Sequence, residues 1–153
     1  MPIRRNREGF TLIELSVVTV IIGILLAIAI PKLNSYVENT RNARAMVDVR
    51  TLEKEIGSHL AFADDYPLSL AEIGRADFLD PWGNPYEYTK IANLEKKAKG
   101  MRKDHFLVPV NSDFDLYSKG KDGESSPPFT AKRSHDDIVR ANNGSYVGLA
   151  QNY

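Results

Sequence analysis

A long apolar segment near the start of the chain, FTLIELSVVTVIIGILLAIAI from Phe10 to Ile30, constrains the fold more than any other feature. As a helix it would span roughly 30 Å, the thickness of the hydrocarbon core of a bilayer. Arg4, Arg5 and Arg7 precede it, and basic residues favour the cytoplasmic side of a membrane. The sequence therefore predicts one membrane-spanning helix, with the chain after Pro31 outside the cytoplasm.

Glu14 interrupts this apolar segment. A carboxylate within a membrane helix costs roughly 2.5–3.5 kcal/mol on insertion scales, and such a residue is a functional candidate by default. Cleavage between Gly9 and Phe10 would leave a free α-amine one helical turn from Glu14. In a bundle of such helices, the amine of a neighbouring copy is the expected partner of this carboxylate.

Three small residues of the segment, Thr19, Gly23 and Ala27, are four positions apart and fall on one stripe. Small residues at this spacing allow helices to approach closely in lipid. They are also common in membrane helices of every kind, so the stripe favours a packing role without establishing one.

The residues from Gly9 to Glu14, GFTLIE, directly before a long apolar helix resemble the prepilin processing motif of type IV pilins and type II secretion pseudopilins. In that family a peptidase cuts after the glycine and methylates the new N-terminal phenylalanine, and the glutamate guides assembly. The resemblance gives these roles to Gly9, Phe10 and Glu14. Pro31 matches a helix-interrupting proline of the family; its ring and missing N–H predict a kink or a melted stretch.

An ordinary secretory signal peptide is the alternative, with Ala27-Ile28-Ala29 as a small-x-small cleavage site. Two features argue against it. Glu14 lies where export signals avoid acidic residues, and the apolar segment is longer than such a signal needs.

After Pro31, residues 34 to 64 predict a continuing amphipathic helix that Asp64-Asp65-Tyr66-Pro67 ends. Its apolar positions recur every three to four residues and predict a half-buried helix that packs on a sheet. These positions are Ala45, Val49, Leu52, Ile56, Leu60 and Ala63.

The remaining residues predict short strands joined by turns. A short helix is expected over 68–78, with Ser69 as its cap and Glu72 three residues on. Strands are expected over 86–89, 106–110 and 114–118, with Pro109 marking an edge strand. Loops are expected over 91–103 and 119–137, and a turn at Asn142-Asn143-Gly144.

The predicted fold is α+β: a long N-terminal helix, membrane-spanning and then amphipathic, packed on a small antiparallel sheet of about three strands with a long C-terminal loop region. Pilins and pseudopilins share this architecture. The expected domains are a prepilin leader (1–9), a transmembrane and filament-core helix (10–33) and a periplasmic α+β domain (34–153).

Two further stretches look like the major pseudopilin of type II secretion systems: DPWGNPYEY at 80–88 and FDLYSKGKDG at 114–123. In that protein the loop after the second stretch ends in an acidic pair and binds calcium. The resemblance therefore implies a calcium site, because calcium prefers six to eight oxygen ligands in a flexible loop. Its implied ligands are the side chains of Asp122, Asp136 and Asp137 and backbone oxygens near Ser118 and Lys119.

The chain departs from the pattern in this region. Residues 124–135 make a longer interval than usual before the acidic pair, and the chain continues past Asp137. The alternative is that these aspartates are turn and cap residues, with a helix that starts at Ile138.

The resemblance implies a structural role and no enzyme activity: a subunit of the pseudopilus, an inner-membrane filament that drives protein secretion. The implied partners are other copies of the chain, minor pseudopilins, the prepilin peptidase, the membrane assembly platform and its ATPase. A type IV pilus subunit for adhesion, motility or DNA uptake is the alternative. Many such pilins carry a C-terminal disulfide, and this chain has no cysteine.

A secreted binding protein or enzyme is the alternative of another class. His59, His105 and His135 are scattered, and Asp113 and Asp115 are best interpreted as a solvated strand edge.

Nucleic acid and a ligand on an aromatic platform are two further candidate partners. The formal net charge of zero removes the electrostatic argument for nucleic acid. Trp82 is expected to fill the small core, with Tyr86 and Tyr88 on one strand face; an aromatic binding platform is the alternative.

Overall fold

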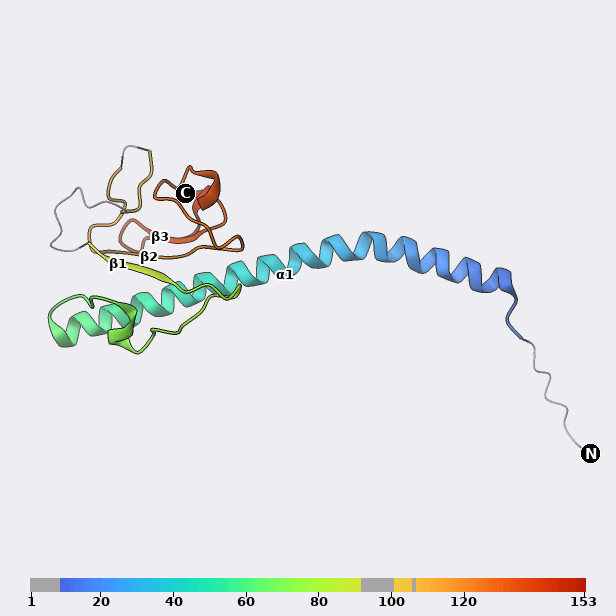
Figure 1. Ribbon diagram of the computed structural model, residues 1–153, viewed down its shortest axis with the longest axis horizontal. Coiled ribbons are helices and arrows are strands. Elements are labelled where there is room, and N and C mark those ends of the chain that lie inside the picture. The colour runs from blue at the N-terminus through green and yellow to red at the C-terminus, as the bar shows by residue number, and fades with distance from the viewer. Residues whose placement is uncertain (1–8, 92–100, 106) are drawn as a thin grey trace, which may run out of the picture. The chain divides into compact units, whose positions relative to one another are not determined.

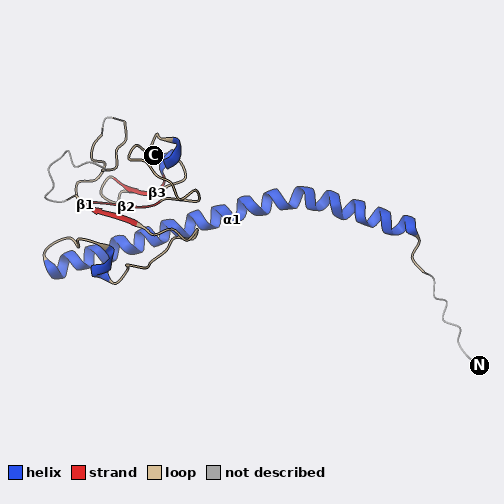
Figure 2. Ribbon diagram, in the orientation of Figure 1, coloured by secondary structure: helices blue, strands red, loops and turns tan. Residues whose placement is uncertain are grey.

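The computed structural model describes residues 9–91, 101–105 and 107–153. The chain divides into two units, residues 1–39 and residues 40–153, which are described separately here. The helix α1 (Leu12–Ala63) runs through the end of the first unit into the second. The strands are β1 (Glu87–Lys90), β2 (Phe114–Ser118), β3 (Ile138–Ala141) and β4 (Tyr146–Leu149), with 3₁₀ turns at Leu70–Ile73, Lys132–Ser134 and Ala150–Asn152 (Figures 1 and 2).

The described part of the first unit is almost entirely helix, and its side chains are exposed from residue 9 to residue 37. An 18-residue window of α1 in this part has a mean hydropathy of 2.7, and none of it is buried within the protein. Length and composition therefore qualify the segment as a membrane span, as predicted.

Pro31 lies inside α1, and the helix is unbroken there. Of the two predicted alternatives at Pro31, the melted stretch is wrong, and the kink stays a prediction. A proline removes one backbone donor, and helices of membrane proteins tolerate that loss because local groups satisfy the freed carbonyls. The carbonyl that Pro31 leaves without a backbone donor is that of Ala27, four residues earlier. The hydroxyl of Ser35 donates to the carbonyl of Pro31 itself at 3.2 Å.

In the second unit, α1 buries the predicted apolar stripe on the core side. Ala45, Val49, Leu52 and Ile56 are fully buried. The stripe ends earlier than predicted, because Leu60 is only half-buried and Ala63 is exposed. The helix stops where expected, at Asp64, which has a positive φ of 57°.

The four strands form one antiparallel sheet in the order β1-β2-β3-β4. Alternate residues of a strand face opposite sides of a sheet. Accordingly, Phe114 and Leu116 of β2 join the core cluster beneath α1, whereas Tyr117 packs on a second cluster. That second cluster contains Val110, Phe129, Val139, Ala141 and Ala150.

The strand predicted over 106–110 is wrong, as far as its residues are described. Phe106 lies outside the described residues, and residues 107–110 belong to no strand of the sheet. Local turns use their backbone groups: Asp104 and Leu107 exchange backbone hydrogen bonds, and the N–H of Val110 donates to the carbonyl of Arg102 at 3.1 Å. The loop predicted over 91–103 also lies largely outside the described residues.

The sheet gains its third and fourth strands from the C-terminal segment, where no strand was predicted. The alternative of a helix starting at Ile138 is also wrong, because Ile138 begins β3. The predicted turn is confirmed: Asn142, Asn143 and Gly144 all have positive φ angles and connect β3 to β4 as a hairpin.

The helix predicted over 68–78 shortens to the 3₁₀ turn Leu70–Ile73. Ser69 makes no side-chain capping bond. Glu72 accepts the backbone N–H of Leu68 at 2.9 Å and not that of Ser69, so the predicted capping pair is wrong. A single turn between Pro67 and Gly74 leaves no room for a longer helix.

Candidate functional site

The predicted processing motif, Gly9 to Glu14, contains a hydrogen-bonded cap at the start of α1. The carboxylate of Glu14 accepts the backbone N–H and the hydroxyl of Thr11, both at 2.8 Å. The hydroxyl of Thr11 in turn accepts the N–H of Glu14 at 3.2 Å. This reciprocal pair is a capping box, which satisfies N–H groups that a helix start leaves without partners. This capping box was not predicted, although Thr-x-x-Glu is its sequence signature.

The residues on both sides of the predicted cleavage bond are open to other molecules. The side chain of Phe10 is 88% exposed, and a Cβ atom placed on Gly9 would meet no atom within 4 Å. Thr19, Gly23 and Ala27 are also exposed. Cleavage, methylation and close helix packing by these residues stay predictions.

The two stretches that resemble the major pseudopilin lie side by side. The Oδ1 atom of Asp80 accepts the N–H groups of Trp82 at 3.0 Å and Asn84 at 2.8 Å, which closes the first turn. The Oδ2 atom of Asp80 accepts the hydroxyl of Ser118 at 2.5 Å. The amide of Asn84 donates to the carbonyl of Gly120 at 2.9 Å. We call this arrangement the Asp80–Ser118 unit.

The predicted calcium ligands lie in the loop that follows this unit, and each carboxylate has its own partners. Asp136 accepts the N–H groups of Lys121 and Asp122 at 2.9 and 3.1 Å. Asp122 accepts the N–H of Glu124 at 2.8 Å. Asp137 forms an ion pair with Arg102 at 2.7 Å.

Burial raises the pKa of Asp137 to about 6, although hydrogen bonds from Ser125 and Arg102 oppose the rise. The ammonium group of Lys119 pairs with Glu87 at 2.5 Å. Within residues 9–91, 101–105 and 107–153, no three acidic, histidine or cysteine side chains gather as a metal-binding group. Calcium binding therefore stays a prediction.

Asp113 and Asp115 are not a solvated strand edge, so that interpretation is wrong. Asp115 is buried and accepts the backbone N–H of Arg102 and the amide of Asn111, both at 2.8 Å. Asp113 pairs with the buried guanidinium of Arg140 at 2.6 Å. Both carboxylates therefore serve the packing of the sheet.

The aromatic residues of the first stretch also serve the core. Tyr86 is buried, and its hydroxyl donates to Asp48 of α1 at 3.0 Å. Tyr88 donates to the carbonyl of Pro67 at 2.8 Å. Trp82 is only partly buried and packs against the main cluster. These contacts favour the core role over a binding platform.

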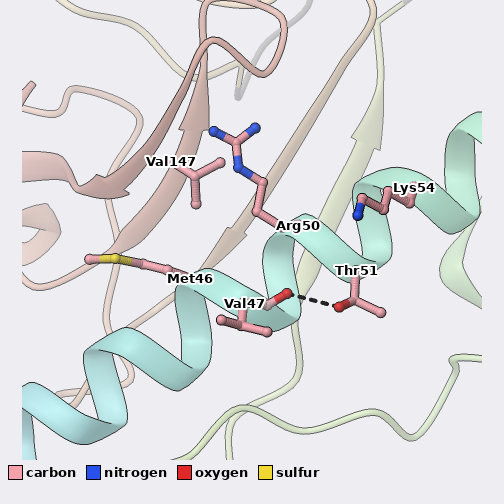
Figure 3. Close-up of a pocket in the computed structure, with 6 residues that line it drawn as sticks. All are labelled: Met46, Val47, Arg50, Thr51, Lys54 and Val147. Atoms are coloured by element: carbon pink, nitrogen blue, oxygen red, sulfur yellow. Dashed lines mark hydrogen bonds between the residues drawn. The ribbon is translucent and has the colours of Figure 1, made fainter.

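Two cavities of the second unit are candidate ligand sites. One, of about 250 Å³, brings together His105 and His135, which sequence spacing had separated. The other, also about 250 Å³, is an open groove between α1 and β4 (Figure 3), lined by Met46, Val47, Arg50, Thr51, Lys54 and Val147. These six residues include no carboxylate, histidine or cysteine, and the Thr51 hydroxyl donates to the carbonyl of Val47 at 2.9 Å. The groove therefore offers no acid–base pair for catalysis.

Comparison with known proteins places the sequence in a family. Residues 4–30 match the model of the prokaryotic N-terminal methylation motif. The type II secretion system core protein G of Pseudomonas aeruginosa is 30% identical over 142 residues, which cover 79% of this chain and 88% of that protein. The type IV major fimbrial protein FimA of Dichelobacter nodosus is 34% identical over 146 residues, covering 92% and 86%.

The chain belongs to the family of type IV pilins and type II secretion pseudopilins. A further relative of the pseudopilin branch, the type II secretion system core protein G of Escherichia coli K12, is 31% identical over 125 residues, covering 78% of this chain and 85% of that protein. No solved structure matches the chain. Members of this family are structural subunits. The exposed apolar part of α1 and the methylation motif fit such a membrane-anchored subunit.

Proposed function

We propose that the chain is a structural subunit of a type II secretion pseudopilus. The observation that carries this proposal is the Asp80–Ser118 unit. Two stretches that resemble the major pseudopilin, separated by 25 residues (89–113) in the sequence, are joined by the hydrogen bonds of Asp80 and Asn84. Similarity to two core G proteins over 79% and 78% of this chain and the absence of cysteine support the same choice.

In this proposal the protein is made with a leader that ends at Gly9 and is held in the inner membrane by α1, with residues 34–153 in the periplasm. A prepilin peptidase removes the leader and methylates Phe10. The apolar helices of successive copies then bundle, and the charge of Glu14 pairs with the new N-terminal amine of a neighbouring copy. A membrane platform, an ATPase and minor pseudopilins complete the machinery.

The second candidate is a subunit of a surface type IV pilus. The similarity to a major fimbrial protein over 92% of this chain favours it. Both candidates use the same membrane helix and the same processing motif. They differ in what the filament does, so the test must compare protein secretion with surface piliation.

The test is deletion of the gene in its own host, followed by complementation. The pseudopilus proposal expects exported proteins to accumulate in the periplasm while surface fibres remain, and the wild-type gene to restore secretion. Loss of surface fibres with normal secretion would instead establish the pilus subunit. A Glu14→Ala gene is the matched control, because its product should enter the membrane and restore neither phenotype.

A further inference from the structure

The loop from Lys119 to Asp137 encloses a buried cation, which is the guanidinium group of Arg102. The side chain of Arg102 is 3% exposed and that of Asp137 is fully buried. Nη2 of Arg102 lies 2.7 Å from Oδ2 of Asp137. A charge pair removed from water in this way persists only where further hydrogen bonds satisfy it.

The same guanidinium binds the middle of the loop. Nη1 of Arg102 donates to the hydroxyl of Ser125 at 2.5 Å and to the carbonyl of Ser126 at 2.9 Å. The hydroxyl of Ser125 then donates to Asp137 at 2.5 Å. The cation therefore links the middle of the loop to its C-terminal end, as a coordinated metal ion would.

Aromatic rings complete the surroundings of the guanidinium. Its central carbon lies 4.3 Å from the ring centroid of Tyr117 and 5.0 Å from that of Phe129. A cation over an aromatic face gains electrostatic attraction, more so where water is excluded. Both rings fix Arg102 between strand β2 and the loop.

The described donors do not fit a calcium shell. Calcium requires six to eight oxygen ligands, and the carboxylates of Asp122 and Asp136 are turned to backbone N–H groups of the loop. A divalent ion on Asp137 would lie next to a guanidinium that repels it. Oδ1 of Asp137 and Nε of Arg102 are buried and have no hydrogen-bond partner among the described residues, so the carboxylate of Asp137 depends on its pair with the guanidinium.

We propose that Arg102 is the internal cation of this loop and takes the place that the family resemblance gives to calcium. The loop then folds without a bound metal ion. The inference concerns the fold of residues 40–153 and is independent of whether the filament is a pseudopilus or a surface pilus.

The test is a thermal melt of the full-length protein in detergent micelles, followed by near-UV circular dichroism, in calcium chloride and in chelator. The wild-type melting temperature should be the same in both. Arg102→Met should lower it by roughly 10 °C, because it leaves the Asp137 carboxylate buried without its cation. The control is Arg133→Met in the same loop, whose exposed pair with Glu124 should contribute almost nothing.

A double variant separates the charge pair from general damage. Arg102→Met with Asp137→Leu should recover much of the lost melting temperature, since an apolar pair replaces both charges. If Arg102→Met alone does not fold, recovery of a folded protein in the double variant still tests the charge pair. A calcium-dependent rise of several degrees in the wild type, lost in Asp122→Ala, would overturn the proposal. So would an Arg102→Met protein that melts no lower than Arg133→Met.

Discussion

Glu14 combines two properties, a negative charge and a side chain that caps α1, and different variants remove each one. Glu14→Gln keeps the capping geometry, because glutamine serves equally at that position of a capping box. It removes the charge that the proposed assembly contact requires. We therefore expect Glu14→Gln to insert into the membrane normally and to form no filaments, measured by membrane fractionation and filament shearing.

The matched control for this prediction is Thr11→Ala. It removes the cap, at a cost of about 0.5–2 kcal/mol to the helix start, and keeps the carboxylate. Filaments should still form from this variant. If Thr11→Ala abolished assembly while Glu14→Gln did not, the helix cap and not the charge would be what assembly requires.

Asp115 gives the stability of the second unit a pH dependence. Burial raises the pKa of Asp115 from its ordinary value of 3.8, against hydrogen bonds from Arg102 and Asn111 that lower it. Between that value and the raised folded pKa, the native state binds more protons than the unfolded state. The contribution of Asp115 to the unfolding free energy is therefore greatest below pH 4, and falls as pH rises through the folded pKa.

The measurement for this prediction is the difference in unfolding free energy between the wild type and Asp115→Asn as a function of pH. The wild type should lose stability relative to the variant as pH rises above about 4, because the variant has no carboxylate at position 115 to titrate. Asp77→Asn, at an exposed position, controls for the loss of one charge. A flat difference between pH 3 and pH 7 would contradict the prediction.

At the scale of elements, the sequence pattern predicted the turn of the C-terminal hairpin but not its two strands, β3 and β4. Strand β3 has four residues, all buried, and one of them is Arg140. A buried arginine breaks the apolar signature of a strand, and its carboxylate partners lie far away in sequence. The Asn-Gly turn between two apolar segments was nevertheless a hairpin signal. The turn was predicted, but the segments beside it, four residues each, are too short for their pattern to indicate strands.

Arg140 fixes this hairpin to the rest of the sheet and to α1. Its guanidinium pairs with Glu53 of α1 at 2.7 Å and Asp113 at 2.6 Å, and lies 4.0 Å from the ring centroid of Phe114. We expect Arg140→Met to destabilise the protein by about 3 kcal/mol, because the largely buried Asp113 loses its cation and Glu53 loses the more buried of its two arginine partners. Chemical denaturation measures the change.

Arg50→Met is the control for this prediction, since Arg50 pairs with the same Glu53 from a more exposed position. An exposed ion pair contributes about 0–1 kcal/mol, so the loss should be clearly smaller than for Arg140→Met. Equal losses from the two variants would mean that burial of the guanidinium contributes nothing.

At the scale of the whole molecule, local signals predicted well and long-range contacts did not. The length and composition of the apolar segment and the periodic stripe of α1 are local. The membrane-length helix and the buried face of α1 in the second unit therefore followed from sequence. The contact of Arg102 with Asp137 joins residues 35 positions apart. No spacing rule identifies that pair, so the interior of the loop could not be predicted beyond its acidic residues.

The proposed N-terminal processing step would decide what the mature molecule is, and Gly9→Val tests it. After expression with a prepilin peptidase, the intact mass should show loss of residues 1–9 and the gain of one methyl group. Gly9→Val should block this change without disturbing the fold, because a Cβ atom there meets nothing within 4 Å. A failure to cleave would then report on recognition by the peptidase and not on misfolding. Cleavage near Ala29 would instead identify an ordinary export signal and remove the membrane anchor on which filament assembly depends.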